Sequence, residues 1–323
     1  MSDPTATAPE PGERIPDAPL FRDPMHDGAT DPTVVWNAEA GEWWMFYTQR
    51  RADAPGPGFG WVHGTDLGIA SSRDGGRSWL YRGTARGLEH QPGRNTFWAP
   101  EVIRHGDTYH AYVSYITGVP HAWVGDRHIL HYTSADLWDW TLASRLELSS
   151  DRVIDAAVWP LPEGGWRMWY KDEADGSSIH AADSPDLYSW TPTGPVLTDR
   201  AQEGPSVFSL GGWYWLVTDV WAGMAVHRSD DLRTWHRQAE PLLDAPGRRP
   251  GDDAVGNHGM CLAQDEEGYL VYFTSPGGDR PTRVQVAELT VVDGVLRCDR
   301  DAPFAMDWRP ERTVALRGGD LPD

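Results

Sequence analysis

The amino-acid sequence predicts an all-β protein, a five-bladed β-propeller with four-stranded antiparallel blades around a central axial pocket. One short pattern occurs five times: an apolar segment that opens near a polar residue, a tight turn, and an aromatic-rich strand. Short strands that recur every roughly 45–60 residues are typical of propellers. The five opening segments are residues 30–35, 98–103, 154–159, 203–208 and 257–262, and their partner strands are residues 43–48, 109–115, 166–171, 213–218 and 269–274.

The spacing of the five copies indicates one propeller domain over residues 19–323, because no linker rich in Pro, Gly or Ser separates them. Residues 1–18 differ in composition. They are rich in Pro, Ala, Asp and Glu and have few apolar side chains, which predicts a flexible polar arm.

The composition narrows the possible partners. A formal net charge of −20 argues against nucleic acid, because phosphate binding depends on Lys and Arg. No apolar run approaches membrane length and no signal pattern opens the chain, so we expect a cytoplasmic protein without a membrane partner, unless a leader has been removed. The two cysteines supply no disulfide framework, and the oligomeric state stays open.

The connections between the expected third and fourth strands share a turn motif. A Ser is followed two residues later by an Asp, and a Trp follows that Asp after four or five residues. The motif occupies residues 72–79, 134–140, 184–190 and 229–235. Asp and Ser side chains bond back to turn amides, so the motif predicts a structural turn in four blades.

Four other connections are long and rich in Gly, Pro, His and Trp. They span residues 49–65, 82–96, 117–127 and 241–256. In an up-and-down blade, the second-to-third and blade-to-blade connections share one face, which also receives the starts of the inner strands. Long irregular loops on a rigid scaffold usually carry function, so this face is the expected functional side.

Superposing the five opening segments gathers acidic side chains at the propeller axis. One equivalent place in the superposition is occupied by Asp31, Asp155, Glu203 and His258. In the strictest register, Ala99 occupies that place in the second copy, and Gly204, which directly follows Glu203, occupies it in the fourth. Two facing carboxyls are the minimum for hydrolysing a glycosidic bond, since one protonates the leaving oxygen and the other activates water. A third carboxyl raises the pKa of the acid by like-charge repulsion. Each carboxyl, taken singly, also fits a turn or an ion pair.

These segments resemble glycoside hydrolase family 43 and its clan of five-bladed propellers, over residues 21–308. The resemblance rests on Asp31-Pro32, Trp98-Ala99-Pro100, Ile154-Asp155, Glu203-Gly204-Pro205 and Asn257-His258-Gly259. It implies an inverting glycosidase in which Asp31 is the general base, Glu203 the general acid and Asp155 the residue that orients the acid and modulates its pKa. It also implies that no cofactor is required, and that a water or a structural calcium ion lies near His258 in the axial channel.

The same resemblance implies an arginine in the last blade that contacts substrate, for which Arg283 is the first candidate and Arg280 the second. Flat aromatic faces suit sugar rings, and Trp98 and Trp61 are expected to supply them. His258 would point into the pocket, and Glu101, two residues past the axial register, would face the same channel. The expected substrate is a small oligosaccharide or glycoside of the arabinofuranoside, xyloside or galactoside type, cleaved from its end.

Three other functions compete with this one. A propeller that binds carbohydrate without cutting it would use Trp98, Trp61 and Trp221 as stacking platforms. A sialidase-like hydrolase is suggested by residues 72–79, which resemble the Asp-box of sialidases. Five repeats and the lack of an arginine cluster in the acidic register disfavour it. A pure interaction propeller would not need axial acids.

Overall fold

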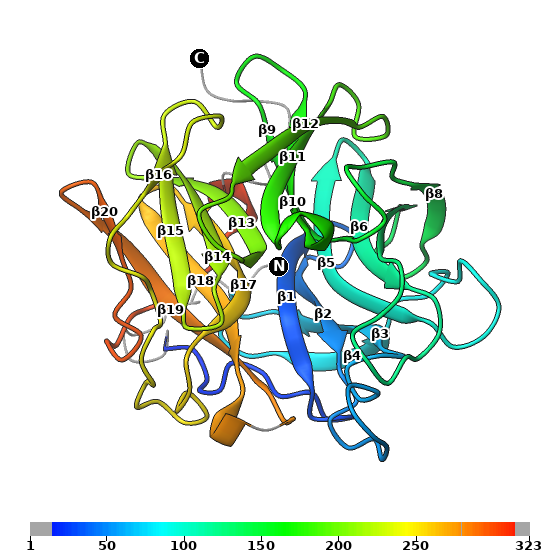
Figure 1. Ribbon diagram of the computed structural model, residues 1–323. Coiled ribbons are helices and arrows are strands. Elements are labelled where there is room, and N and C mark those ends of the chain that lie inside the picture. Colours follow the sequence, from blue (N-terminus) through cyan, green and yellow to red (C-terminus); the bar gives the residue numbers. More distant parts are fainter. Residues whose placement is uncertain (1–14, 279, 314–323) are drawn as a thin grey trace, which may run out of the picture.

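The computed structural model describes residues 15–278 and 280–313, and these form five four-stranded antiparallel sheets (Figure 1). The first two blades contain β1 (Ala29–Asn37), β2 (Glu42–Gln49), β3 (Asp66–Ser72), β4 (Leu80–Thr84), β5 (Thr96–His105), β6 (Thr108–Ile116), β7 (His128–Ser134) and β8 (Thr141–Arg145). The third and fourth contain β9 (Val153–Pro160), β10 (Trp166–Asp172), β11 (Ser178–Ser184), β12 (Thr191–Leu197), β13 (Glu203–Leu210), β14 (Trp213–Asp219), β15 (Met224–Ser229) and β16 (His236–Arg237). The fifth contains β17 (Asn257–Gln264), β18 (Glu267–Thr274), β19 (Arg283–Val292) and β20 (Val295–Arg297). Short 3₁₀ turns are η2 (Glu173–Asp175), η3 (Pro276–Gly278) and η4 (Pro310–Arg312).

The five sheets are arranged around a common axis, which confirms the predicted five-bladed propeller. The first strand of each blade is innermost, and β1, β5, β9, β13 and β17 each lie beside the inner strands of both neighbouring blades (Figure 1). Strand order within every sheet follows the chain, so each blade is an up-and-down meander.

Aromatic side chains fill the space within and between the blades. Trp43, Trp44, Trp169 and Trp215 are almost fully buried. Burying a large side chain of this kind stabilises the fold by about 1.5–3 kcal/mol or more, which explains why much of the high tryptophan content serves packing.

Segments outside the twenty strands join the first blade to the last. Near the N-terminal end of the described chain, Phe21 pairs with Val284 of β19. Near the C-terminal end, the Trp43 indole Nε1 donates to the Trp308 carbonyl at 2.9 Å, and the Trp308 amide donates to the Gly75 carbonyl at 3.0 Å. These contacts tie the segments around Phe21 and Trp308 to the first and last blades.

The repeated Ser–Asp–Trp turns have the structural role that their sequence predicts. In the turn after β15, the Asp231 Oδ1 accepts from the amides of Arg233 and Thr234 at 2.8 and 2.7 Å. Ser229 Oγ accepts from the amide of Leu232 at 2.9 Å. These turn amides are the main reason that the pKa of Asp231 is lowered to about 2. The turn that resembles an Asp-box is thus one member of a structural set.

Each inner strand is interrupted near its start by a β-bulge, where its register against the second strand shifts by one residue. Four bulge residues have left-handed backbone: Asp31 (φ 52°), Ala99 (φ 42°), Asp155 (φ 60°) and Gly204 (φ 54°). Bulges next to functional sites re-aim side chains. The strict register is therefore confirmed, with Gly204 equivalent to Asp31. The looser superposition that placed Glu203 there was wrong by one residue.

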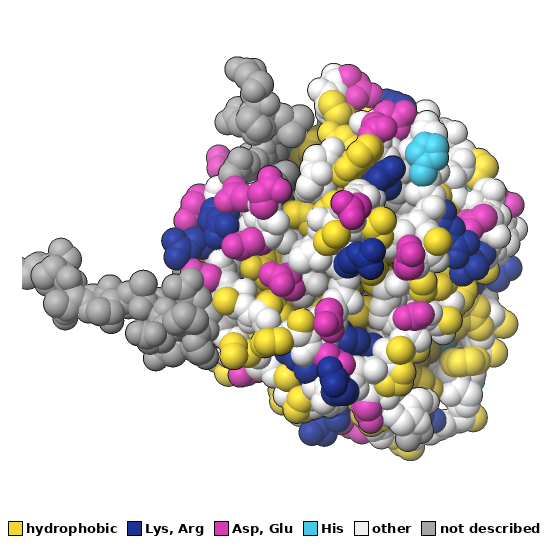
Figure 2. Space-filling view, turned by 90° about the vertical axis from the view of Figure 1, so that its left-hand side faces the viewer, with side chains coloured by type: hydrophobic (Ala, Val, Ile, Leu, Met, Phe, Trp, Pro, Cys, Tyr) yellow, Lys and Arg dark blue, Asp and Glu magenta, His cyan; other side chains and the backbone are white. Residues whose placement is uncertain are grey.

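Of the predicted polar arm over residues 1–18, residues 1–14 lie outside the described residues, as do residues 314–323 of the predicted domain. Within the arm's described part, the Asp17 amide donates to the Arg77 carbonyl at 2.9 Å. Among the residues that the structure describes, no helix has the length and apolar character needed to cross a membrane. On the face drawn in Figure 2, acidic and basic side chains are interspersed.

Candidate active site

The bulges border a pocket on the axis with a volume of about 260 Å³. Its acidic lining comes from four strands and comprises Asp31 (β1), Asp155 (β9), Glu203 (β13) and Asp219 (β14). Its aromatic lining comprises Phe59, Trp61, Trp98, Trp123, Trp221 and Phe273. The predicted gathering of Asp31, Asp155 and Glu203 thus occurs in the structure, and His258 joins them.

Two of the four predicted long loops contribute to this pocket. The β2–β3 loop supplies Phe59 and Trp61, and the β6–β7 loop supplies Trp123. The connections over residues 82–96 and 241–256 supply no lining residue. Second-to-third strand loops of the first two blades therefore help to shape the pocket.

Hydrogen bonds between neighbouring blades fix the bulges. The Thr48 hydroxyl accepts from the Ala99 amide at 2.8 Å, and the Ser114 hydroxyl accepts from the Asp155 amide at 2.9 Å. Asp219 Oδ2 accepts from the His258 amide at 2.8 Å. Thr48, Ser114 and Asp219 occupy equivalent places on the second strands. Three of the five blades thus position the bulge of the next blade in this way.

Asp31 is surrounded by donors. The neighbouring Thr30 hydroxyl donates to Asp31 Oδ2 at 2.9 Å, and Arg50 Nη2 lies 3.8 Å from the same oxygen. His258 Nδ1 lies 3.5 Å from Asp31 Oδ1. The carboxyl is 7% exposed, so it faces the pocket while these groups orient it.

Asp155 is buried at the third bulge. Its Oδ2 accepts from the Gly204 amide at 3.2 Å, which holds it directly beside the Glu203 segment. Burial raises the pKa of Asp155 well above its usual range; His258 opposes this and the Glu203 carboxyl adds to it. Asp155 therefore holds a proton at higher pH than an exposed aspartate does.

Glu203 is held at both oxygens. Lys171 Nζ donates to Oε2 at 2.7 Å, and the Trp221 indole Nε1 donates to Oε1 at 2.8 Å. Trp221 belongs to the β14–β15 loop and is 49% exposed. Glu203 is more accessible than Asp31 or Asp155, which places it where a substrate atom can approach.

Asp219 supports the same region from the strand next to Glu203. Besides the His258 amide, it accepts from the Trp221 amide at 2.7 Å through Oδ1, which shapes the loop that carries the Trp221 ring. Burial raises the pKa of Asp219 well above its usual range, and Glu203 adds to this by like-charge repulsion.

Gly204 makes room for His258. A Cβ atom at position 204 would lie 2.3 Å from the His258 Cγ, and its backbone is left-handed. We expect Gly204→Ala to lower the free energy of unfolding by about 2–4 kcal/mol, since left-handed strain and a ring clash add together. Urea denaturation measures this. The matched control is Gly41→Ala, which has φ +64° and open space around it, so that only about 1 kcal/mol should be lost. Equal losses for both variants would contradict the clash.

The tryptophans predicted to stack on sugar rings differ in exposure: Trp98 is buried, Trp61 is half-buried and Trp221 is exposed. Trp98 is only 6% exposed; its indole donates to the Val62 carbonyl at 2.6 Å, and its ring is stacked on Trp123 at 5.2 Å. Trp61 lines the pocket and lies under the Arg280 guanidinium at 5.5 Å. Trp123, at 42% exposed, offers more free ring surface at the mouth than Trp98 does.

The structure gives the predicted arginines other partners. Arg283 donates to Asp27 Oδ1 at 2.7 Å, and Arg280 donates to the Ala54 carbonyl at 2.9 Å. Neither lines the pocket. The arginine that does is Arg50, directly after β2, whose guanidinium lies over the Phe273 ring at 5.3 Å. Because it lines the pocket, Arg50 is the best placed of the three arginines to meet a ligand.

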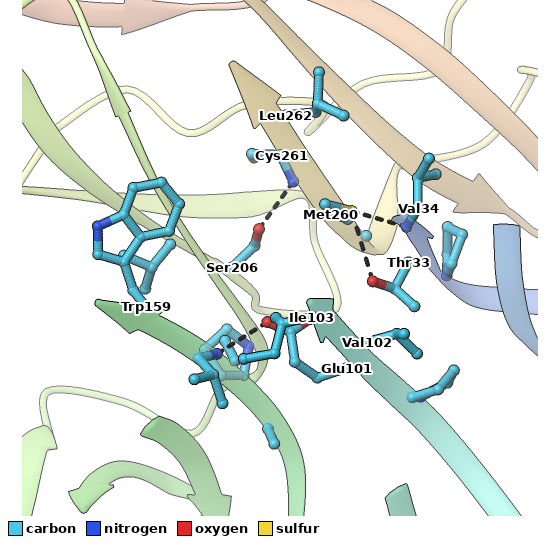
Figure 3. Close-up of a pocket in the computed structure, with 18 of the residues that line it drawn as sticks. Thr33, Val34, Glu101, Val102, Ile103, Trp159, Ser206, Met260, Cys261 and Leu262 are labelled. Carbon is cyan, nitrogen blue, oxygen red and sulfur yellow. Dashed lines mark hydrogen bonds between the residues drawn. The ribbon is translucent and has the colours of Figure 1, made fainter. Parts of the chain in front are cut away.

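Glu101 lies away from the pocket, in a narrow axial channel of about 60 Å³ beneath it (Figure 3). Its Oε1 accepts from the Val158 amide at 2.9 Å, and burial raises its pKa to about 7. The equivalent side chains Ser206 and Met260 likewise accept from the amides of Cys261 and Val34 in the next blade. Glu101 thus belongs to a second ring of inter-blade contacts, not to the pocket lining.

The axial channel does not match the needs of a calcium ion. Calcium takes about six to eight oxygen ligands, several of them carboxylates. Among residues 15–278 and 280–313, no group of three or more His, Cys, Asp or Glu side chains could hold a metal ion. Besides His258, the channel is lined by the carboxyls of Asp31 and Glu101, by the Met260 sulfur and by apolar side chains such as Val34 and Val102, of which Glu101, Met260, Val34 and Val102 are labelled in Figure 3. These residues do not fit the implied ion.

Sequence reasoning missed Lys171, Asp219, Arg50 and Trp123. The first two stand at equivalent places on second strands, opposite the bulges, and aligning the partner strands as well would have found them. Arg50 and Trp123 lie in second-to-third strand loops whose length and sequence differ from blade to blade, so repetition gives no signal for them.

Comparison with solved structures identifies the architecture. A thermostable family-43 glycoside hydrolase superposes with a TM-score of 0.67 at 19% identity, over 90% of this chain and 99% of that one. A family-43 enzyme from Xanthomonas citri gives 0.66 at 15% identity, over 88% and 94%. A family-43 β-xylosidase/α-arabinofuranosidase from a compost microbial metagenome, solved with xylotriose, gives 0.63 at 17% identity, over 84% and 94%. The chain therefore shares the propeller fold of family-43 glycoside hydrolases. No protein-family model and no curated protein sequence matches the chain.

Proposed function

We propose that this protein is a glycoside hydrolase that cleaves short oligosaccharides or glycosides by an inverting mechanism. The observation that carries the proposal is the convergence of Asp31, Asp155 and Glu203, from three different inner strands, on one pocket lined with aromatic rings. Acidic groups supply the proton transfers of glycoside hydrolysis, and aromatic faces bind sugar rings.

In this proposal Asp31 is the general base. Deprotonated, it takes a proton from the water that attacks the anomeric carbon, while Thr30, Arg50 and His258 orient its carboxylate. Glu203 is the general acid and gives its proton to the leaving oxygen as the glycosidic bond breaks. To do so, Glu203 Oε1 gives up its hydrogen bond from the Trp221 indole and forms one to the leaving oxygen. The exposed position of Trp221 permits this change of partner.

Asp155 orients the acid and modulates its pKa. It reaches the Glu203 segment through the Gly204 amide, and its buried carboxyl adds a second acidic group to the surroundings of the acid. Asp219 is equally buried next to Glu203. The modest volume of the pocket, about 260 Å³, supports cleavage at the end of a short chain.

A panel of glycosides tests the proposal. Structural neighbours include a β-xylosidase/α-arabinofuranosidase solved with xylotriose, an enzyme solved with xylose and an exo-1,5-α-L-arabinanase. The panel therefore contains nitrophenyl xylosides, arabinofuranosides and galactosides, together with the matching short oligosaccharides. Product anomers are followed by NMR, and we expect inversion. A retained anomer would overturn the mechanism, and binding without hydrolysis across the panel would favour a carbohydrate-binding propeller.

A further inference from the structure

One buried cation, Lys171, stands next to the proposed acid. Lys171 on β10 has a side chain that is 4% exposed, and its Nζ lies 2.7 Å from Glu203 Oε2 and 3.3 Å from Glu173 Oε1. It also lies 5.3 Å from the Trp221 ring centre. Burying an ammonium is costly unless it is paired, so its place between two carboxylates is a built feature of the site.

The neighbouring charges hold Lys171 in position from several elements. Glu173 of η2 is itself paired with Arg127 at 3.0 Å and accepts from the Trp123 indole at 3.0 Å. Burial opposes the charge of Lys171, but Glu203, Asp155 and Glu173 outweigh it and raise the pKa of Lys171. Lys171 is therefore protonated at neutral pH.

The repeat shows that Lys171 departs from a pattern shared by three other blades; the fifth blade has Phe273 at this place. At the equivalent places, Thr48, Ser114 and Asp219 accept the amide of the next bulge. A lysine has three donors and no acceptor, so it cannot do this. The Gly204 amide turns to Asp155 Oδ2 instead. The third blade thus gives up an acceptor at this place and gains a cation aimed at Glu203.

We propose that Lys171 is a positioning residue for the general acid: its ammonium fixes the Glu203 carboxyl and stabilises the negative charge that this carboxyl acquires on donating its proton. The proposal rests on the proposed glycosidase function. In the step concerned, the bond from the anomeric carbon to the leaving oxygen breaks and its electron pair goes to that oxygen. The oxygen takes the proton of Glu203, leaving a carboxylate next to Lys171, while water, losing a proton to Asp31, forms the new bond to the anomeric carbon.

Charge balance explains why such a cation is needed. Glu203 must ionise during the reaction in a pocket that also contains Asp31, Asp155 and Asp219. Arg50 lies by the base at 3.8 Å, and His258 also faces it, so Lys171 is the cation that contacts the acid directly. A positive charge at hydrogen-bond distance favours the ionised form of a carboxyl.

The test varies the leaving group in the full-length protein. Lys171→Met keeps an unbranched side chain, one atom shorter than that of lysine, and removes its charge. We expect kcat on unactivated oligosaccharides to fall about 10- to 100-fold, as for the loss of one charge-assisted hydrogen bond in the transition state. Dinitrophenyl glycosides need little protonation of the leaving oxygen, so their kcat should fall less than about 3-fold. The alkaline limb of the pH profile should move to higher pH, because a carboxyl without a neighbouring cation keeps its proton longer.

Two further variants complete the experiment. Lys171→Arg keeps the charge and should restore the wild-type dependence on leaving group. Glu173→Gln keeps an acceptor for the Trp123 indole and removes the carboxylate that competes with Glu203 for the Lys171 ammonium. This variant should move the alkaline limb of the pH profile to lower pH. It carries the test where Lys171→Met fails to fold. A uniform loss on all leaving groups without a shift of the pH profile would overturn the role of Lys171. If instead the wild type hydrolyses no glycoside, or Glu203→Gln leaves turnover intact, the proposed function fails.

Discussion

Replacing Asp31 by Asn should lower kcat by about 10²–10⁴ and leave the fold intact, because general-base catalysis contributes that much to rate. The substitution removes the charge that accepts the proton of the attacking water. It keeps the shape of the side chain, and the amide oxygen still accepts from the Thr30 hydroxyl. Asn also tolerates the left-handed backbone of this bulge, at φ 52°, nearly as well as Asp does. Steady-state kinetics on the best substrate of the panel measures the loss.

The control for this variant is Asp230→Asn. Asp230 is an exposed aspartate in the turn after β15, so the same chemical change there should leave kcat within twofold. Thermal denaturation of both variants should stay within a few degrees of the wild type. An Asp31→Asn protein that is folded and fully active would exclude Asp31 as the base.

Replacing Glu203 by Gln should produce a loss that depends on the leaving group. An acid catalyst matters most where the leaving oxygen is strongly basic, so kcat on unactivated oligosaccharides should fall by about 10²–10⁴. On dinitrophenyl glycosides the fall should be about tenfold or less. The measurement is kcat across a series of aryl glycosides, plotted against the pKa of the released phenol, and the slope should steepen in the variant.

The matched control is the exposed Glu240, whose change to Gln should leave both slope and kcat unchanged. The Glu203→Gln protein also loses the ion pair to Lys171, so its thermal stability must be recorded. A folded variant with equal losses on good and poor leaving groups would assign Glu203 to substrate binding instead of proton transfer.

The sequence was informative for the fold because the signal is local and repeated. Every blade repeats a pair of strands that are rich in aromatic residues and joined by a short polar turn. The first strand of each pair is the inner strand of its blade. The same repetition located Asp31, Asp155 and His258, since the bulge recurs at one register. The place of Glu203 follows only from the stricter register, in which Gly204 is equivalent to Asp31 and Glu203 stands one residue before it.

The rest of the site depends on a finer alignment or on features that do not repeat. Lys171 and Asp219 stand at one repeated place on the second strands, and only an alignment of those strands as well as the first ones shows it. Only the geometry of the structure favours Arg50 over Arg283 as the arginine that meets a ligand, because the Arg283 guanidinium is paired with Asp27. Trp123 reaches the pocket from a loop whose course no pattern in the chain predicts. Packing and charge pairing in three dimensions decide these cases.

The left-handed bulges have a consequence for how this scaffold can change. Such backbone accepts Gly, Asn and Asp at little cost and disfavours longer or branched side chains. Asp31 and Asp155 occupy bulge positions, whereas the longer Glu203 stands one residue earlier, outside the left-handed place. The axis thus contains two kinds of slot, one that selects short side chains through its backbone and one that leaves length free. The proposed acid and base therefore cannot exchange places. Redesign of the reaction should exchange Asp, Asn and Gly at the bulge positions, and should vary the length of the side chain only at the residue before the bulge.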